Sequence, residues 1–325
     1  MDVDQEEQAT FSAAEAAVYD RQMRLWGVEA QKRLQNSQVF ISGLSALGSE
    51  LVKNLVLSGM NVTVHDPRAV TQGVVDTQFF FFESDVGKNR AEASLEKVKE
   101  LNPLVQVQCE TSPLSELSDD FFKKFTVICL IGAEKDAELR LDALSRAHEI
   151  AFFTAHSFGF DGVVFADLGK HLYRRTPAGT SGAVPASDPI TVDFPSITDA
   201  NQVQWSTLQS ARKRGPQIPK VYVKHQLLQE YTSQKGVSEV ASAGVDDFVT
   251  FAQAQLQAQG LAADFFSAEE LSSLAKVSGV DLVPVCAILA GILGQEVVKA
   301  ISQKDEPICN YFCFDGAAGT VRRIG

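Results

Sequence analysis

The sequence predicts an α/β fold, in which a Rossmann-like, doubly wound and mainly parallel sheet carries helices on both faces, with a mostly helical insertion. Three observations predict it. Short apolar runs typical of strands alternate with longer amphipathic runs typical of helices between residues 39 and 154. A glycine-containing loop connects the first of these strands to its helix. Near the C-terminus, a strongly apolar pattern typical of a helix and then a strand follows a long segment with a mostly helical pattern.

The N-terminal segment predicts a helix that begins near Ser12. Glu15 follows three residues later, which is the spacing of a capping box. The apolar face of this helix consists of residues at helical spacing: Tyr19, Met23, Trp26 and Ala30. Arg21 and Arg24 fall outside that face, so we expect them to point to solvent or toward a partner protein.

Strands and helices then alternate along the first half of the chain. Strands are expected at residues 39–42, 62–65, 105–109, 126–131 and 151–154, and helices at 46–57, 91–101 and 137–149. Parallel strands joined by helices have right-handed crossovers, which place the helices on both faces of the sheet.

The rest of the chain predicts a linker, an insertion and a closing segment. Residues 176–196 are rich in Pro, Gly, Ser, Ala and Thr, which is typical of a linker or an exposed loop. Residues 203–279 are mostly helical, 284–301 form an apolar helix and 311–314 a strand. We therefore expect three parts: an N-terminal helix and Rossmann-like domain over 1–175, a linker and helical insertion over 176–280, and a C-terminal helix and strands over 281–325 that complete the α/β domain.

Charge and composition exclude several classes of partner. A net charge of −12 argues against binding to nucleic acid or to an anionic membrane surface, since both need a basic face. The apolar run 282–293 is too short to span a bilayer, which needs about 20 residues, and predicts a buried core helix. Residues 1–7 lack the basic and apolar regions of a signal peptide.

The cysteines and histidines suggest neither a disulfide framework nor a metal site. The 5 cysteines are odd in number and lie mostly in apolar runs, as reduced thiols of a cytosolic or nuclear protein do. Cys309 and Cys313 are four residues apart on a predicted strand, where core packing is favoured over zinc. No nucleophile elbow surrounds a Cys or Ser residue, and we expect no bound metal.

The glycine loop comprises residues 43–48, from Gly43 to Gly48, and follows the first strand. An intact phosphate-binding loop reads Gly-x-Gly-x-x-Gly, and its second glycine lets the backbone approach a pyrophosphate. Ser45 stands at that second position, so a side chain occupies the point of closest approach. Asp66 follows the second strand, where an acid either bonds a ribose hydroxyl or caps a turn before Pro67. The loop is thus the scaffold of a nucleotide site with a damaged contact.

Residues 19–27, around Arg21, are the most distinctive segment of the chain. Their charged residues are either the solvated face of an amphipathic helix or the source of an arginine that supplies charge to a phosphate. This segment resembles the N-terminus of the activating enzymes for ubiquitin-like proteins. Residues 86–94, Asn102-Pro103 and residues 284–300 resemble three later blocks of the same family. The likeness covers both ends and most of the first half of the chain.

Within that family, length and pattern resemble the smaller, non-catalytic subunits of heterodimeric SUMO-activating enzymes. Catalytic members read Asn-Arg-Gln-Phe after the second strand, and the arginine touches ATP phosphates. Here Asp76 and Thr77 replace the asparagine and the arginine, and Arg90 replaces a later lysine. A threonine cannot offset triphosphate charge, and an aspartate repels it. No Cys-x-x-Cys pair and no inserted domain with a catalytic cysteine are present.

The resemblance implies a division of labour between two subunits. The catalytic partner would bind Mg-ATP and the SUMO C-terminus, form the acyl-adenylate and take the acyl group as a thioester. This chain would bind no cofactor, would contact SUMO mainly through its partner, and would not be catalytic alone. Arg21 would reach the partner's ATP phosphates in trans, whereas Arg24 is a weaker candidate. The resemblance also implies a location in the nucleus and the cytoplasm.

Three alternatives stay open at this point. The regulatory subunit of the neddylation activating enzyme is much longer through its middle. An NAD-dependent Rossmann oxidoreductase would use the same loop, but Ser45 and the lack of a Tyr-x-x-x-Lys pair count against it. A self-sufficient adenylyltransferase acting on bacterial sulfur carriers is disfavoured by Thr77 and by the missing zinc cysteines.

Overall fold

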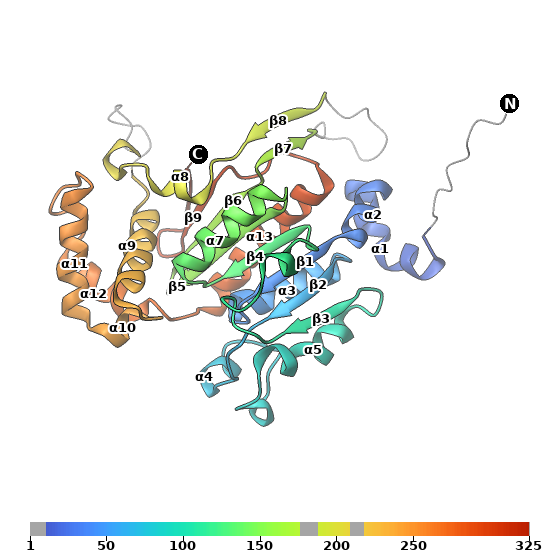
Figure 1. Cartoon of the computed structure of the whole chain (residues 1–325), viewed down its shortest axis with the longest axis horizontal. Coiled ribbons are helices and arrows are strands. Elements are labelled where there is room, and N and C mark those ends of the chain that lie inside the picture. Colours follow the sequence, from blue (N-terminus) through green and yellow to red (C-terminus); the bar gives the residue numbers. More distant parts are fainter. Residues whose placement is uncertain (1–10, 176–187, 209–217, 325) are drawn as a thin grey trace.

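The computed structural model describes residues 11–175, 188–208 and 218–324. Much of the expected linker, residues 176–187, therefore lies outside the described residues. The described part folds around an eight-stranded sheet in the order β10-β9-β6-β5-β4-β1-β2-β3 (Figure 1).

Five neighbouring strands of this sheet run parallel. They are β1 (Gln38–Ser42), β2 (Asn61–His65), β3 (Val107–Glu110), β4 (Val127–Ile131) and β5 (Ala151–Phe158). Their order, β3-β2-β1-β4-β5, is that of the first five strands of the doubly wound 3-2-1-4-5-6 sheet. The parallel sheet predicted from the alternation of strands and helices is thus confirmed, and β5 continues four residues beyond the predicted end at 154.

The sheet is completed by antiparallel strands from distant parts of the chain. β6 (Asp161–Asp167) pairs with β5, β9 (Tyr311–Asp315) pairs with β6, and β10 (Thr320–Ile324) forms the edge. A separate hairpin joins β7 (Lys170–Tyr173) to β8 (Ile190–Asp193). The predicted C-terminal strand therefore lies in the same sheet as the first half of the chain.

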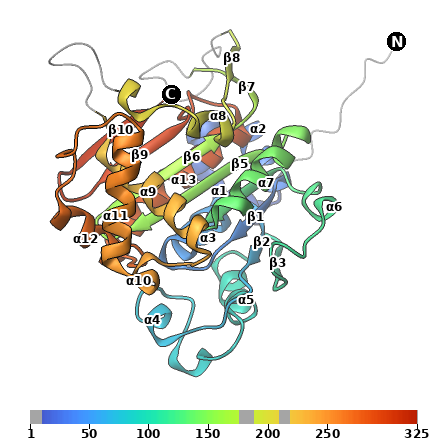
Figure 2. The same cartoon turned by 60° about the vertical axis from the view of Figure 1, so that its left-hand side comes forward.

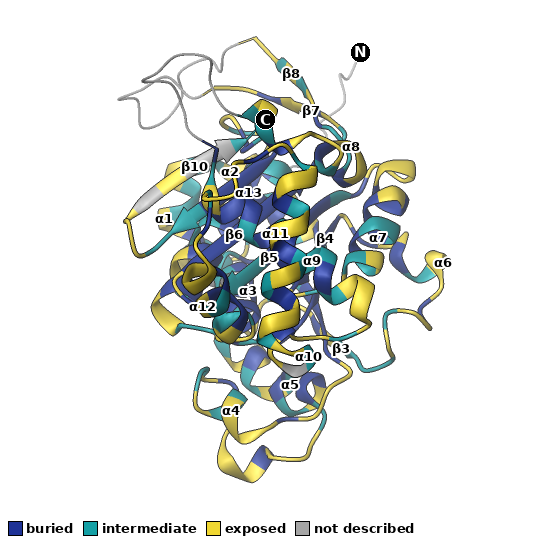
Figure 3. Ribbon diagram, turned by 90° about the vertical axis from the view of Figure 1, so that its left-hand side faces the viewer, coloured by how far each residue is buried: buried dark blue, intermediate teal, exposed yellow. Residues whose placement is uncertain are grey.

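Helices cover both faces of the sheet, as predicted. One face packs on α3 (Ala46–Leu57), α5 (Arg90–Leu101) and α13 (Val283–Ser302), and the other on α7 (Lys135–Ala147) and the later helices. Neighbouring residues of β1 show this alternation, because Val39 and Ile41 belong to one core and Phe40 to the other. Figure 3 shows the strands buried between the two helical layers.

The mostly helical insertion forms a group of helices on the second face. It consists of α8 (Ile197–Asn201), α9 (Lys220–Lys235), α10 (Val240–Ala243), α11 (Val245–Ala258) and α12 (Ala268–Val277). Figure 2 shows α9 to α12 gathered side by side. Their buried residues, such as Tyr231, Phe248 and Leu271, join the same core as Phe40 of β1.

The N-terminal helix differs from the prediction because it breaks at Gly27. The Ser12–Glu15 capping box is present, but α1 (Ala13–Trp26) ends where Gly27 adopts a φ of 87°, and α2 (Val28–Asn36) begins after it. A positive φ is readily accessible to glycine and costly for other residues. The predicted apolar face is thus divided between two helices.

Helix α13 is the predicted apolar core helix and extends the predicted range 284–301 by one residue at each end. Its 20 residues have a mean hydropathy of 1.6, so in length and composition the helix could cross a membrane. Within this helix, 56% of an 18-residue window is buried inside the protein. Leu289, Leu293 and Val297 are fully buried against the core that α3 shares.

Two buried carboxyl groups lie side by side between α7, β6 and α8. Asp142 and Asp167 are each 1% exposed. Asp142 accepts a hydrogen bond from the Ile197 N–H at 3.0 Å, and Arg146 donates to Asp167 at 2.6 Å. Burial and then the charge of Asp167 raise the pKa of Asp142 to about 7. The native protein therefore holds a proton on this pair that the unfolded chain releases near pH 4.

This raised pKa predicts that stability falls as the pH rises from about 4 to about 7. In Asp142→Asn the amide replaces the carboxyl, donates to Asp167 and does not ionise. We expect the variant to be more stable than the parent at pH 8, by about 2–4 kcal/mol, and to lose most of this advantage at pH 5. Urea unfolding at the two pH values measures the difference. Asp246→Asn, at an exposed position, is the control; an unchanged pH slope in Asp142→Asn would contradict the prediction.

Candidate functional site

The glycine loop between β1 and α3 is tightly packed. Gly43 has a φ of 98°, and a Cβ atom there would lie 2.2 Å from the Ile131 carbonyl oxygen. A Cβ on Gly48 would lie 1.8 Å from the Gly43 carbonyl oxygen. Both glycines are therefore needed for the turn itself, whether or not a phosphate binds. Ser45 caps α3 in an extended conformation, and its side chain makes no capping hydrogen bond.

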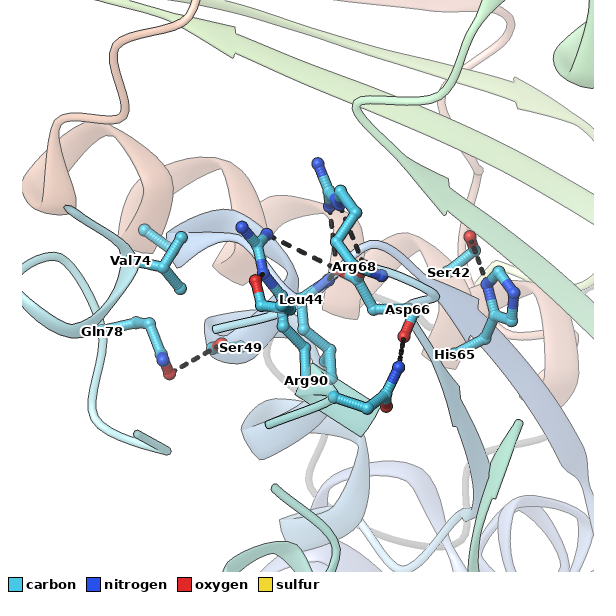
Figure 4. Close-up of polar contacts among 12 residues, drawn as sticks. Ser42, Leu44, Ser49, His65, Asp66, Arg68, Val74, Gln78 and Arg90 are labelled. Carbon is cyan, nitrogen blue, oxygen red and sulfur yellow. Dashed lines mark hydrogen bonds and ion pairs between the residues drawn. The ribbon is translucent and has the colours of Figure 1, made fainter. Parts of the chain in front are cut away.

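Asp66 is fully buried beside the loop and is already bonded to the chain's own donors (Figure 4). The Leu44 N–H donates to Oδ2 at 2.8 Å, and the guanidinium of Arg68 donates to both oxygens at 2.9 and 2.8 Å. The backbone N–H of Arg68 also donates to Oδ1, across Pro67, at 3.0 Å. This is the turn-capping arrangement that the sequence left open as the alternative to a ribose contact.

The electrostatics of Asp66 follow from this pairing. Burial by itself would raise the pKa of the carboxyl, but the hydrogen bonds and charge of Arg68 and the N–H of Leu44 outweigh it, so the pKa is lowered. Arg90 adds a second cation, with its Nη1 atom 3.6 Å from Oδ2 and its Nε donating to the Ala69 carbonyl at 3.0 Å. Asp66 is a charged carboxylate held by two arginines.

A cavity of about 250 Å³ opens beside the N-terminus of α3. Its lining comprises Ala46, Glu50, Asp76, Thr77, Gln78, Phe79 and Val283. None of these 7 residues carries a positive charge and two carry a negative one. The Thr77 hydroxyl donates back to the Gly73 carbonyl at 3.2 Å, and Asp76 accepts from Gln72 at 3.0 Å. These residues do not fit a triphosphate, which needs cations and free donors at this place.

The site includes two residues that sequence reasoning missed. Arg68 saturates Asp66, and Asp281 accepts a hydrogen bond from the Ala46 N–H at 3.1 Å. Arg68 lies two residues after Asp66, so a local acid–arginine pair was the available signal. Asp281 is 235 residues from Ala46, and no sequence pattern links the two.

Arg21 lies elsewhere, on the exposed side of α1. Among the described residues it makes no hydrogen bond and no ion pair, whereas Arg24 pairs with Asp20 at 3.0 Å. Gln22, next to it, donates to the Leu57 carbonyl at the end of α3. The 12 residues of α3 separate this end from the glycine loop by about 17 Å. Arg21 therefore cannot serve the loop of its own chain.

Exposed apolar side chains flank Arg21. Val18 and Leu25 are 56% and 75% exposed and lie three residues before and four residues after Arg21 on α1. Val28, 50% exposed, begins α2 after the break at Gly27. Leu57 is 44% exposed and borders a groove of about 220 Å³ between α3 and α13. The groove is lined by Asn54, Leu57, Ser58, Gly291, Gly294, Gln295 and Val298. We call the groove together with Val18, Arg21, Leu25 and Val28 the α1 face. In the groove only Leu57 and Val298 have apolar side chains, so the apolar part of this face consists mainly of Val18, Leu25 and Val28.

The cysteines are not poised for catalysis. Burial raises the pKa values of Cys286 and Cys313 to about 12 and also raises that of Cys129, so these groups stay thiols at neutral pH. Within the described ranges, no group of three or more His, Cys, Asp or Glu side chains is placed to hold a metal ion.

Comparison with known proteins places this architecture in a family. The ThiF family matches residues 19–324. SUMO-activating enzyme subunit 1 of Xenopus laevis is 35% identical over 96% of this chain and 96% of its own length. The proteins of that name from Danio rerio and Homo sapiens are each 34% identical, over 98% and 95% of this chain and 97% and 94% of their own. The chain therefore belongs to the ThiF family.

Proposed function

We propose that this chain is the non-catalytic subunit of a heterodimeric SUMO-activating enzyme and supports ATP-dependent adenylation and thioester activation of SUMO by a catalytic partner subunit. The observation that carries the proposal is full-length similarity, at 34–35% identity, to proteins named SUMO-activating enzyme subunit 1. The length of the match favours it over the longer neddylation subunit.

The chain's own glycine loop is proposed to bind no nucleotide. Asp66 has no free acceptor position toward a ribose, since Leu44 and Arg68 use both of its oxygens. The lining of the cavity beside α3 contains no cationic residue, its Glu50 is already paired with Lys53, and the charge of its Asp76 would repel a phosphate. Mg-ATP would therefore bind in the partner, where the SUMO carboxylate attacks the α-phosphate and releases pyrophosphate.

The contribution of this chain to the reaction is proposed to come from the α1 face. Arg21 is exposed, without a partner in the described chain, and too far from its own loop, so its guanidinium is available to a phosphate of another subunit. The surrounding apolar side chains of Val18, Leu25 and Val28 would be covered by that subunit. Burial of these three side chains against that subunit would hold Arg21 in place at the partner's ATP site.

ATP–pyrophosphate exchange driven by SUMO tests the proposal. It is measured for this chain alone, for the larger subunit alone and for the equimolar mixture. We expect robust exchange from the mixture and none above background from this chain alone. Robust exchange by this chain alone would overturn the non-catalytic assignment. A fluorescence titration with NADH serves as the parallel check, because saturable binding would favour the oxidoreductase alternative.

A further inference from the structure

The first turn of α3 is capped by a side chain from the far end of the sequence. The Ala46 N–H, at the first position of the helix, donates to Oδ2 of Asp281 at 3.1 Å. The usual capping residue, Ser45, makes no side-chain hydrogen bond of this kind. An N–H at this position has no partner within the helix and needs an acceptor from outside. Asp281 supplies that acceptor together with a full negative charge.

The Asp281 carboxylate is held in place from the strand side as well. The Ser157 hydroxyl donates to Oδ1, so both oxygens are engaged. Asp281 also forms a β-bridge with Gly159, whose N–H donates to the Val280 carbonyl at 2.9 Å. Because α13 begins two residues later, the side chain is anchored between the end of β5 and a core helix. This is a fixed position and not that of a freely moving surface acid.

The Asp281 carboxylate occupies a position that favours a negatively charged group. The N-terminus of a helix carries a partial positive charge, and backbone N–H groups there bind phosphates in glycine-loop proteins. Arg68 and Arg90, which hold Asp66, also lie within electrostatic range of Asp281. A second loop N–H, that of Leu44, is taken by the carboxylate of Asp66. Two internal carboxylates thus bind the loop donors that would otherwise face a phosphate.

We propose that Asp281 is a built-in substitute for a phosphate group: its carboxylate fills the anion position at the start of α3 and keeps the glycine loop ordered without a nucleotide. The loop is then complete in the isolated chain, and its stability does not depend on a ligand. This inference concerns the chain by itself and does not rest on the partner or on SUMO.

Removal of the carboxylate tests the proposal. In Asp281→Ala we expect the Tm to fall by roughly 2–4 °C, because a cap and its charge interaction are lost. We also expect inorganic phosphate or pyrophosphate, added at constant ionic strength, to restore the Tm of this variant in a saturable manner. The parent protein should show no such saturable response. Thermal unfolding and titration calorimetry on the full chain measure both effects.

Three further variants make the result specific. Asp246→Ala changes the net charge equally at an exposed position of α11 and should respond to phosphate as the parent does. Ser157→Ala loosens Asp281 but leaves its charge in place, so it should gain no phosphate binding. Asp281→Asn keeps the shape of the side chain without its charge and gives the readout if the alanine variant does not fold. The proposal is overturned if neither Asp281 variant gains a phosphate response beyond that of Asp246→Ala.

Discussion

Arg21→Ala should lower SUMO adenylation by the heterodimer about 10³-fold, while the two subunits still assemble. The arginine is proposed to supply a delocalised positive charge to the partner's ATP phosphates, where charge builds up in the transition state. Nothing in the described part of its own chain depends on it, because it is exposed and makes no ion pair or hydrogen bond there. The folding of this subunit should therefore be unchanged. Pyrophosphate exchange measures the loss, and size-exclusion chromatography the assembly.

Two matched variants separate this effect from a general loss of surface charge. Arg24→Ala removes a cation one turn away that is already paired with Asp20, and adenylation should stay within a few-fold of the parent. Arg21→Lys keeps the charge but loses the planar fork of donors, so an intermediate rate is expected. Equal adenylation by the parent and Arg21→Ala would contradict this role and support the alternative, in which Arg21 is only part of the solvated face of an amphipathic helix.

The second large effect is expected from Gly48→Ala, which should cost at least about 3 kcal/mol of stability. The added methyl group would sit 1.8 Å from the Gly43 carbonyl oxygen. That oxygen belongs to the backbone of the loop, so it cannot move aside cheaply. The sign of this stability change is informative, because glycine-to-alanine changes inside helices normally raise the free energy of unfolding by up to about 1 kcal/mol. Urea unfolding of the isolated chain gives the value.

The control positions lie in the same loop and in another helix. Ser45→Gly should change stability by less than about 1 kcal/mol, because Ser45 is extended, with a φ of −81°, and its hydroxyl caps nothing. Gly291→Ala, in α13, meets no atom within 4 Å and should be neutral or stabilising. If Gly48→Ala and Gly291→Ala have the same free energy of unfolding, the tight turn does not explain why glycines stand at positions 43 and 48.

Sequence periodicity predicted the sheet because its strands are buried on both faces. The apolar runs at Val39–Ile41 and Val127–Ile131 are typical of central strands between two helical layers, and both are buried in the sheet. The break at Gly27 was not predicted, since the apolar spacing continues across it from Trp26 to Ala30. A positive φ at a single glycine is a local backbone property, and a hydrophobic pattern does not report it.

The candidate site was predictable only where its residues are neighbours in sequence. The loop glycines and Asp66 stand at fixed offsets from their strands, and their positions followed from the motif. The contact between Asp281 and Ala46 depends on how the last helix is placed against the first strand–helix unit. Such a pairing is a property of the assembled sheet, and a reading along the chain contains no signal for it.

The position of Arg21 at the opposite end of α3 from the glycine loop has a consequence for how this protein can vary. One end of α3 forms the turn of its own chain, whereas the other lies beside the α1 face, which we propose is covered by the catalytic subunit. Substitutions around Asp76 and Thr77 should accumulate freely as long as the turn at Gly43 and Gly48 survives. Changes on the face that carries Arg21 and Leu25 should be tolerated only together with matching changes in a second gene product.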